Sequence, residues 1–310
     1  MKKSYWVTLG VALLIVATVL GWFFYGAEEF LRRAEMEPAK PAPQVETSGP
    51  TSECPHTFIS WNGGNFGKKK TDEDIALMAK ILAHADIIAL QEVTAGKNVG
   101  AQTVGRLVDA LKRMGSDWDY VVSDPTEPPS LEVERYAYLI KKHVAAFDRD
   151  DAVLVKSLRN PIEREPYTLL FHPKTGMPFR IFTIHTVPTA KGPIREVSAL
   201  VEAEEVKKAD RAIVAGDFNL GPAKTDPLFT EIGYTGHIHE LTSLRLKLKN
   251  GQYRKEQYDN IYTKGIKVCS SGVIDFVKNH FATGDKSVDQ DALDRAHRDS
   301  DHLPVFITFR

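Results

Sequence analysis

Apolar and polar positions alternate along most of this chain in two periods, which predict strands mixed with helices. Short apolar runs bounded by turn residues are typical of strands, and apolar positions three or four apart are typical of helices. Strands are predicted over His56–Trp61, Asp86–Leu90, Tyr120–Val122, Tyr136–Lys141, Ala152–Val155, Thr168–Phe171, Phe179–His185, Ala212–Asp217, Asn260–Thr263, Gly272–Phe276 and Leu303–Phe309. Helices are predicted over Thr71–Ala83, Thr103–Lys112 and Arg195–Lys207. This order indicates an α/β (α+β) fold, with two mixed sheets packed face to face and helices outside.

The N-terminal region has a different pattern. After a short tail, residues 1–5, an uncharged apolar run covers residues 6–27. A helix rises about 1.5 Å per residue, so this run matches a bilayer core of roughly 30 Å. The alternative is a cleaved signal peptide, but its apolar region would span about 7–15 residues, and Tyr25 replaces the small residue expected at a cleavage site. We expect a transmembrane signal anchor that places the domain following it in the periplasm or elsewhere outside the cytoplasm.

Residues 28–54 predict a linker, because prolines at positions 38, 41, 43 and 50 make a stiff, solvated spacer. One domain is expected over residues 55–310. Its composition is that of an ordinary globular protein, and the net charge of −1 provides no general basic field for nucleic acid. Cys54 and Cys269 are the two cysteines. They are either unrelated thiols or, in an oxidising compartment, one long-range disulfide.

Polar residues with metal- and phosphate-binding chemistry stand at the ends of predicted strands. Gly216-Asp217-Phe218-Asn219 closes one buried strand, and Gln91-Glu92 follows another. Ser300-Asp301-His302 directly precedes the last strand. Open α/β sheets place their sites at such strand ends. Carboxylate, amide and imidazole groups gathered there suit a divalent cation and a phosphate.

The order of these motifs resembles the endonuclease/exonuclease/phosphatase superfamily, and within it type I deoxyribonucleases and related toxin nuclease subunits. The matching segments are Phe58-Ile59-Ser60-Trp61-Asn62, Leu90-Gln91-Glu92-Val93, Glu134-Arg135-Tyr136, Arg164-Glu165-Pro166, Thr183-Ile184-His185, Gly216-Asp217-Phe218-Asn219, Tyr258-Asp259-Asn260-Ile261 and Ser300-Asp301-His302-Leu303-Pro304. The resemblance covers nearly the whole domain. It implies a four-layer α/β/β/α sandwich with the site at the sheet edges.

The resemblance implies a metal site at Glu92, Asn62 and Asp301. Carboxylate and amide oxygens suit Mg²⁺, and Mn²⁺ or Ca²⁺ are alternatives. Asn62 also has a purely structural interpretation, because an amide before two glycines commonly caps a turn.

Two histidines are the expected acid and base, since imidazole titrates near neutral pH. The resemblance pairs His185 with Glu134 and His302 with Asp259. It also implies that Asp217 orients the attacking water. Each carboxylate would fix the tautomer of its imidazole and raise its pKa.

For the phosphate itself, the resemblance implies contacts from Asn219 and from Arg164, whose guanidinium would clamp an oxygen. The favoured activity is therefore a membrane-anchored, metal-dependent endonuclease acting on DNA phosphodiester bonds. The alternatives are a sphingomyelinase-like phospholipid phosphodiesterase, a small-phosphoester phosphatase, and a non-catalytic binding module. A lipid enzyme calls for a hairpin with exposed aromatic residues, and we expect none at the polar loop Lys247–Lys255, whose one aromatic residue is Tyr253.

The positions that grip duplex DNA in those nucleases differ in this chain. Two arginines and a tyrosine are replaced by Gly64, Thr94 and Glu132. Arginines in the groove neutralise phosphates and read its shape. We therefore expect weak cleavage of duplex DNA, unless the run Lys68-Lys69-Lys70 supplies the grip.

Overall fold

The computed structural model describes residues 53–96, 99–127, 133–284 and 287–310. The predicted tail, the anchor at residues 6–27 and nearly all of the linker lie outside these ranges, as does Glu132. Within the described ranges, no helix combines the length and apolar character needed to cross a membrane.

The first sheet has the strand order β14-β15-β1-β2-β4-β3. Its strands are β1 (His56–Phe66), β2 (Ile87–Thr94), β3 (Trp118–Val122), β4 (Glu134–Lys141), β14 (Val268–Val273) and β15 (Val305–Phe309). β1 and β2 run parallel, so their carboxyl ends lie at one edge. β15 runs antiparallel to β1, which brings the residues just before β15 to that same edge.

The second sheet has the order β10-β13-β9-β8-β7-β5, with β6 paired to β7. The strands are β5 (Ala145–Phe147), β6 (Val153–Leu154), β7 (Tyr167–Pro173), β8 (Phe179–His185), β9 (Ala212–Asp217), β10 (Thr235–Gly236) and β13 (Asp259–Lys264). The parallel register of β8 and β9 sets His185 opposite Asp217. Antiparallel β13 sets Asp259 opposite Asp217 on the other side.

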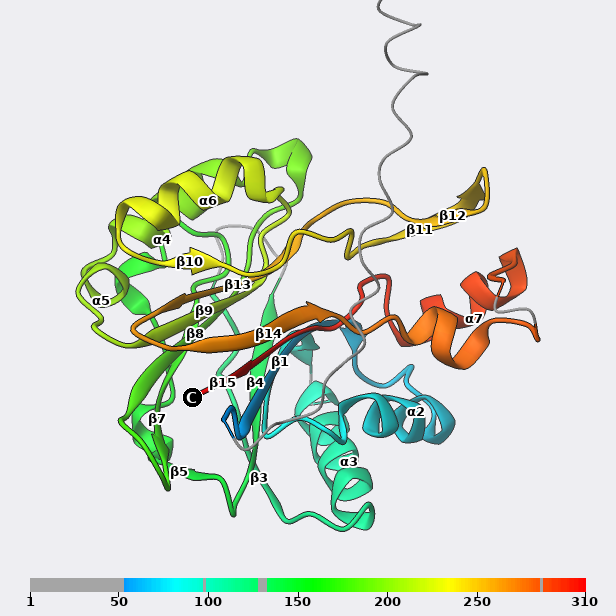
Figure 1. The fold of residues 1–310 in the computed structure, drawn as a ribbon, viewed down its shortest axis with the longest axis horizontal. Coiled ribbons are helices and arrows are strands. Elements are labelled where there is room, and N and C mark those ends of the chain that lie inside the picture. The colour runs from blue at the N-terminus through cyan, green and yellow to red at the C-terminus, as the bar shows by residue number, and fades with distance from the viewer. Residues whose placement is uncertain (1–52, 97–98, 128–132, 285–286) are drawn as a thin grey trace, which may run out of the picture. The chain divides into compact units, whose positions relative to one another are not determined.

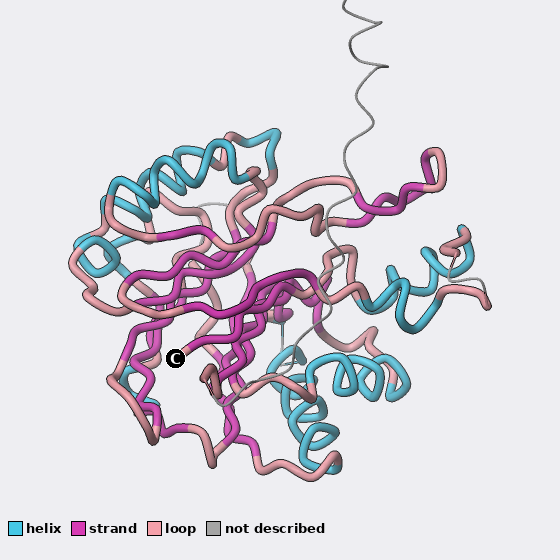
Figure 2. The backbone as a smooth tube through the Cα atoms, viewed as in Figure 1, coloured by secondary structure: helices cyan, strands magenta, loops and turns pink. Residues whose placement is uncertain are grey.

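Helices cover the outer faces of both sheets (Figures 1 and 2). One group is α2 (Asp72–Leu82), α3 (Val99–Arg113) and α7 (Gln290–Asp299), and the other is α4 (Ile194–Glu202), α5 (Glu204–Lys207) and α6 (Pro222–Glu231). Shorter turns are the 3₁₀ segments Arg149–Asp151, Lys156–Leu158 and Thr189–Lys191 and the π-helical turn Val277–Phe281. The four-layer α/β/β/α sandwich is confirmed.

The alternation of side chains along each strand explains why apolar cores form on both faces of the sheets. Phe58 belongs to the core between the sheets, whereas its neighbour Ile59 belongs to the core under α2, α3 and α7. Ile87 and Ile88 divide in the same way. Successive side chains of a strand point to opposite faces, so fully apolar strands fill two cores at once.

The cysteines are joined. The Cys54–Cys269 disulfide has a Cα–Cα distance of 6.4 Å and ties the segment before β1 to β14. Of the two alternatives that the sequence left open, the structure contains the disulfide.

Several elements differ from the sequence-based prediction. The predicted helix Arg195–Lys207 is two helices, α4 and α5, because Ala203 adopts an extended conformation. α6 was not predicted because it contains two prolines. Pro222 occupies the first helical turn, where its missing N–H is not needed, and Pro227 lies inside the helix.

α7 and a hairpin were also not predicted. α7 is mostly polar and buries only a narrow apolar side, which includes Leu293. The segment expected to be a polar loop, Lys247–Lys255, instead belongs to a hairpin of β11 (Leu244–Lys249) and β12 (Gln252–Arg254), whose one aromatic residue, Tyr253, is half-buried. Asn250 and Gly251 both have positive φ, 52° and 74°, and an Asn-Gly pair favours such a two-residue hairpin turn.

Candidate active site

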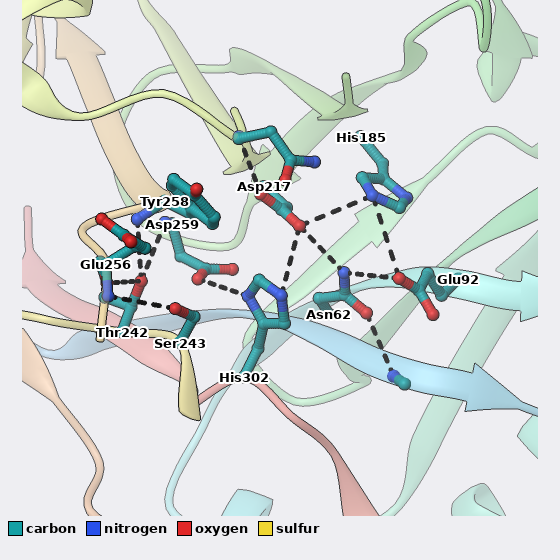
Figure 3. A network of polar contacts seen from close by, with 12 residues as sticks. Asn62, Glu92, His185, Asp217, Thr242, Ser243, Glu256, Tyr258, Asp259 and His302 are labelled. Carbon is teal, nitrogen blue, oxygen red and sulfur yellow. Dashed lines mark hydrogen bonds and ion pairs between the residues drawn. The ribbon is translucent and has the colours of Figure 1, made fainter. Parts of the chain in front are cut away.

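Six polar side chains converge where strands of both sheets end (Figure 3). Each comes from a different position in the chain; the parallel pairs β1–β2 and β8–β9 each align two of them, and contacts of β1 with β9 and of β2 with β8 join the two pairs. The six are Asn62 in β1, Glu92 in β2, His185 ending β8, Asp217 ending β9, Asp259 opening β13 and His302 just before β15.

Asp217 lies at the centre and is only 1% exposed. Its Oδ2 is 3.5 Å from Nε2 of His185 and 3.5 Å from Nε2 of His302. The same oxygen accepts a hydrogen bond of 3.1 Å from Asn62 Nδ2. Burial raises the pKa of Asp217, but the charges of His302 and His185 outweigh it and hold this pKa below its usual range. Both imidazoles therefore face one buried carboxylate.

His302 is paired with Asp259 as predicted. The distance between His302 Nδ1 and Asp259 Oδ2 is 2.7 Å, which directs Nε2 of the ring toward Asp217. Thr242 Oγ1 accepts a 3.0 Å bond from the Asp259 N–H and so fixes the start of β13. Burial lowers the pKa of His302, but Asp259 and Asp217 raise it well above the usual value.

His185 is paired with Glu134, with 2.9 Å between Nδ1 and Oε2. Burial lowers the pKa of His185, yet the charge and hydrogen bond of Glu134 raise it overall. Tyr136 supports the strand end, because its hydroxyl accepts a 3.2 Å bond from the His185 N–H. Each imidazole therefore has a carboxylate at its Nδ1 and the Asp217 oxygen 3.5 Å from its Nε2.

Arg164 does not reach toward the centre as expected for a phosphate clamp. It is 3% exposed, and its Nη1 donates to Glu134 at 3.0 Å. Its Nε and Nη2 donate to the carbonyl oxygens of His185 and Thr186 at 3.0 and 2.6 Å. All three guanidinium nitrogens are held by the protein. The phosphate role is therefore corrected to a buried contact behind His185.

Glu92 and Asn62 lie together, as predicted. Asn62 Nδ2 donates to Glu92 Oε1 at 2.9 Å, and Asn65 N–H donates to Oε2 at 2.7 Å. Asn62 Oδ1 also accepts from Gly64 N–H at 3.0 Å, so the turn-capping interpretation holds beside the site interpretation. Glu92 has a φ of 57°, a strained conformation for this residue that is concentrated at functional sites.

The oxygen-rich side chains fit a divalent cation. Each Glu92 oxygen accepts one hydrogen bond and keeps further lone pairs, and carboxylate oxygens are the ligands that Mg²⁺ prefers. Ligand atoms of Asp217, Asp259 and His302 also lie within 4.8 Å of one another. Asp301 is exposed at the rim of these side chains: a β-carbon at Gly64 would lie 3.5 Å from its Oδ1, and its charge contributes to the raised pKa of His302.

Asn219 binds the loop after β8 rather than pointing freely outward. Its Nδ2 donates to Thr186 O at 3.0 Å, and its N–H donates to Asp217 Oδ1 at 2.8 Å. Sequence reasoning missed two supporting residues. Ser300 Oγ donates to Asn62 O at 2.6 Å, a contact that its place in the Ser-Asp-His motif could have suggested. No pattern in the sequence indicated Thr242.

A family model for the endonuclease/exonuclease/phosphatase family matches residues 59–302, which include the whole convergence of side chains. The chain belongs to this family. The endonuclease/exonuclease/phosphatase family consists of phosphoesterases that are typically dependent on a divalent metal, so the protein is a phosphoesterase. No curated protein matches the chain.

Solved structures of the endonuclease/exonuclease/phosphatase family share the fold. A family protein from Leptotrichia buccalis is 16% identical with a TM-score of 0.57, over 82% of this chain and 99% of that one. TDP2 of D. rerio, in complex with a single-strand DNA product, is 15% identical with a TM-score of 0.54, over 82% and 98%. A mannosyl-6-phosphatase from Bacteroides thetaiotaomicron is 15% identical with a TM-score of 0.53, over 82% and 99%.

Proposed function

We propose that the protein is a divalent-metal-dependent phosphodiesterase that cleaves nucleic acid, with DNA as the first substrate to test. One observation carries the proposal: Nε2 of both His185 and His302 lies 3.5 Å from the same Asp217 oxygen. A substrate phosphate bound there would have an imidazole on either side. Hydrolysis of a diester needs a group that accepts the proton of the attacking water and another that protonates the leaving oxygen.

In this proposal each paired carboxylate acts on its imidazole. Glu134 and Asp259 bond to Nδ1 of their histidines, so the Nε2 atoms remain for proton transfer. One imidazole accepts the proton of the water, and the other protonates the oxygen released when the P–O bond breaks. Asp217 holds both rings and stabilises their positive charge. A cation held by Glu92 with Asn62 would neutralise charge on the phosphate.

The substrate class is supported by the site and by one structural relative. The TDP2 structure contains a single-strand DNA product, which makes nucleic acid the first choice. The similarity to a mannosyl-6-phosphatase makes a small phosphoester the second candidate. The site itself suits either substrate, because a nucleic-acid diester and a hexose phosphate both release a strongly basic sugar oxygen that an imidazole can protonate.

The test is hydrolysis by the purified protein of plasmid DNA, single-stranded DNA, RNA, sphingomyelin, an aryl phosphodiester and a hexose phosphate, with Mg²⁺, Mn²⁺ or Ca²⁺. We expect cleavage of DNA and the aryl diester that chelation abolishes. His185→Ala and His302→Ala should each lower kcat/KM by about 10²–10⁴-fold. His239→Ala is the matched control, because that side chain is 63% exposed and lies outside the site. Histidine variants as active as the parent, or hydrolysis confined to sphingomyelin or the monoester, would contradict the proposal.

We also propose that residues 6–27 anchor the protein in a membrane and direct the domain out of the cytoplasm. The support is the uncharged run itself. Fractionation of cells should place the full chain in the membrane pellet and a chain lacking residues 1–27 in the soluble fraction. Equal solubility of the two chains would contradict this.

A further inference from the structure

The β11–β12 hairpin is rooted in the active site through both of its arms. Ser243, just before β11, pairs with His302, and the Leu244 N–H donates to Asp301 O at 2.7 Å. On the return arm, Thr242 Oγ1 accepts the N–H groups of Tyr258 and Asp259 at 3.1 and 3.0 Å. Figure 1 shows the hairpin projecting from this edge beyond both sheets. A polymer bound along the hairpin would therefore extend to the position of His302.

The hairpin is supported from behind. Gln290 of α7 accepts the Leu248 N–H at 2.9 Å and donates to Leu246 O at 3.0 Å. Arg254 of β12 forms a 2.6 Å ion pair with Asp275. Leu248 packs against the core under α2, α3 and α7. These contacts hold β11 in a fixed position relative to the site.

The hairpin carries positive charge that the protein does not neutralise. Residues 244–255 include basic side chains at 245, 247, 249, 254 and 255 and no acid. Arg254 is paired with Asp275 and Lys255 with Glu256. Lys247 and Lys249 are exposed and form no ion pair within the described part of the chain. They flank the partly buried Leu248, so strand alternation places both side chains on the opposite face of β11, with their Cα atoms about 6.7 Å apart along the strand.

We propose that Lys247 and Lys249 bind the phosphate backbone of a nucleic-acid substrate and lead it to the two histidines. The inference rests on the proposed function and adds the surface that grips the polymer. Two cations at this spacing match a chain of repeating phosphates, since lysines bind phosphates as point charges.

The run Lys68-Lys69-Lys70, which the sequence suggested as a DNA-binding surface, is partly buried. Lys70 is 4% exposed, and its Nζ donates to the carbonyl oxygen of Arg298 at 2.8 Å.

A lipid surface is the alternative ligand of the hairpin. Leu246, at 79% exposure, is its one fully projecting apolar side chain, and Tyr253 is half-buried. Interfacial binding uses a broad apolar face, which the hairpin lacks.

The experiment compares the full-length parent with Lys247→Ala/Lys249→Ala. The matched control is Lys174→Ala/Lys267→Ala, because both of these lysines are exposed and precede strands whose far ends lead to the site. Each protein is assayed on a single-stranded oligonucleotide and on a small aryl phosphodiester over a range of salt. On single strands, each phosphate contact contributes about 0.7 to the slope of log affinity against log salt concentration. Losing two contacts should therefore raise the KM for the oligonucleotide roughly 25-fold at about 0.1 M salt.

The expected result is a rise in oligonucleotide KM and a salt slope lower by about 1.4, with unchanged kcat/KM on the aryl diester. An unchanged oligonucleotide KM would overturn the hairpin proposal while leaving the nuclease intact. Equal losses on both substrates would also overturn it, because the defect would then lie in the catalytic centre. A parent that cleaves the aryl diester but no nucleic acid would instead overturn the proposed substrate. If the double variant loses binding to phosphatidylserine vesicles and keeps oligonucleotide KM, the hairpin binds lipid.

Discussion

Replacing Arg164 by Met should separate a positioning role from a phosphate contact. Methionine keeps much of the length and apolar stem but removes the charge and all donors. Three hydrogen bonds are lost, to Glu134 and to the carbonyl oxygens of His185 and Thr186. Because Arg164 is buried, these acceptors are left without their donor in a site that water reaches poorly.

The magnitude follows from burial. Breaking a buried ion pair by removing one partner costs about 3–5 kcal/mol. Glu134 is 17% exposed and keeps its bond to His185, which favours the lower end of that range. Each carbonyl oxygen that loses its donor adds about 1 kcal/mol. We expect the free energy of unfolding to fall by about 3–5 kcal/mol, and Tm by roughly 6–20 °C for a domain of this size.

The kinetic signature differs from that of a lost phosphate contact. With Glu134 and the end of β8 unsupported, His185 is misplaced, so kcat should fall on the aryl diester while KM changes little. The assay combines thermal unfolding with Michaelis kinetics at a temperature well below the Tm of the variant. Arg164→Lys, which keeps the charge but cannot make three bonds, should give intermediate losses. An unchanged Tm with a strongly raised KM would refute the reasoning and restore the phosphate clamp.

Three further predictions concern stability. Gly216→Ala should lower the free energy of unfolding by at least about 2 kcal/mol in a urea titration, because φ is 151° and a β-carbon would lie 1.9 Å from Ile184 O; an unchanged midpoint would contradict this. Replacing Cys54 and Cys269 by serine opens a loop of 215 residues and should cost about 5 kcal/mol, whereas two reactive thiols in oxidised protein would disprove the bond. Burial lowers the pKa of His237 from 6.5 to about 4, so the unfolded chain binds the extra proton between these values. The parent should therefore lose stability relative to His237→Gln as pH falls from 6.5 to 4, and a constant difference would contradict it.

The sequence by itself determined the layers and most of the site residues. Neighbours such as Phe58 and Ile59 alternate between two cores, and that alternation is a local property that apolar patterning records directly. The motif residues Glu92, His185 and His302 also fall where strand ends place them. Elements with weak apolar patterns, such as the proline-containing α6 and the polar α7, escaped prediction because tertiary packing stabilises them.

Only the tertiary structure decided which charged groups meet. Asn62 and Asp217 are 155 residues apart in sequence and belong to different sheets, and the packing of β1 against β9 brings their side chains to 3.1 Å. Arg164 turned out to be buried against Glu134, and Lys70 against the end of α7. A basic residue has the same sequence signature whether its partner is a phosphate, a carboxylate or a carbonyl oxygen. Its partner is fixed by long-range contacts, which the local pattern of the chain does not contain.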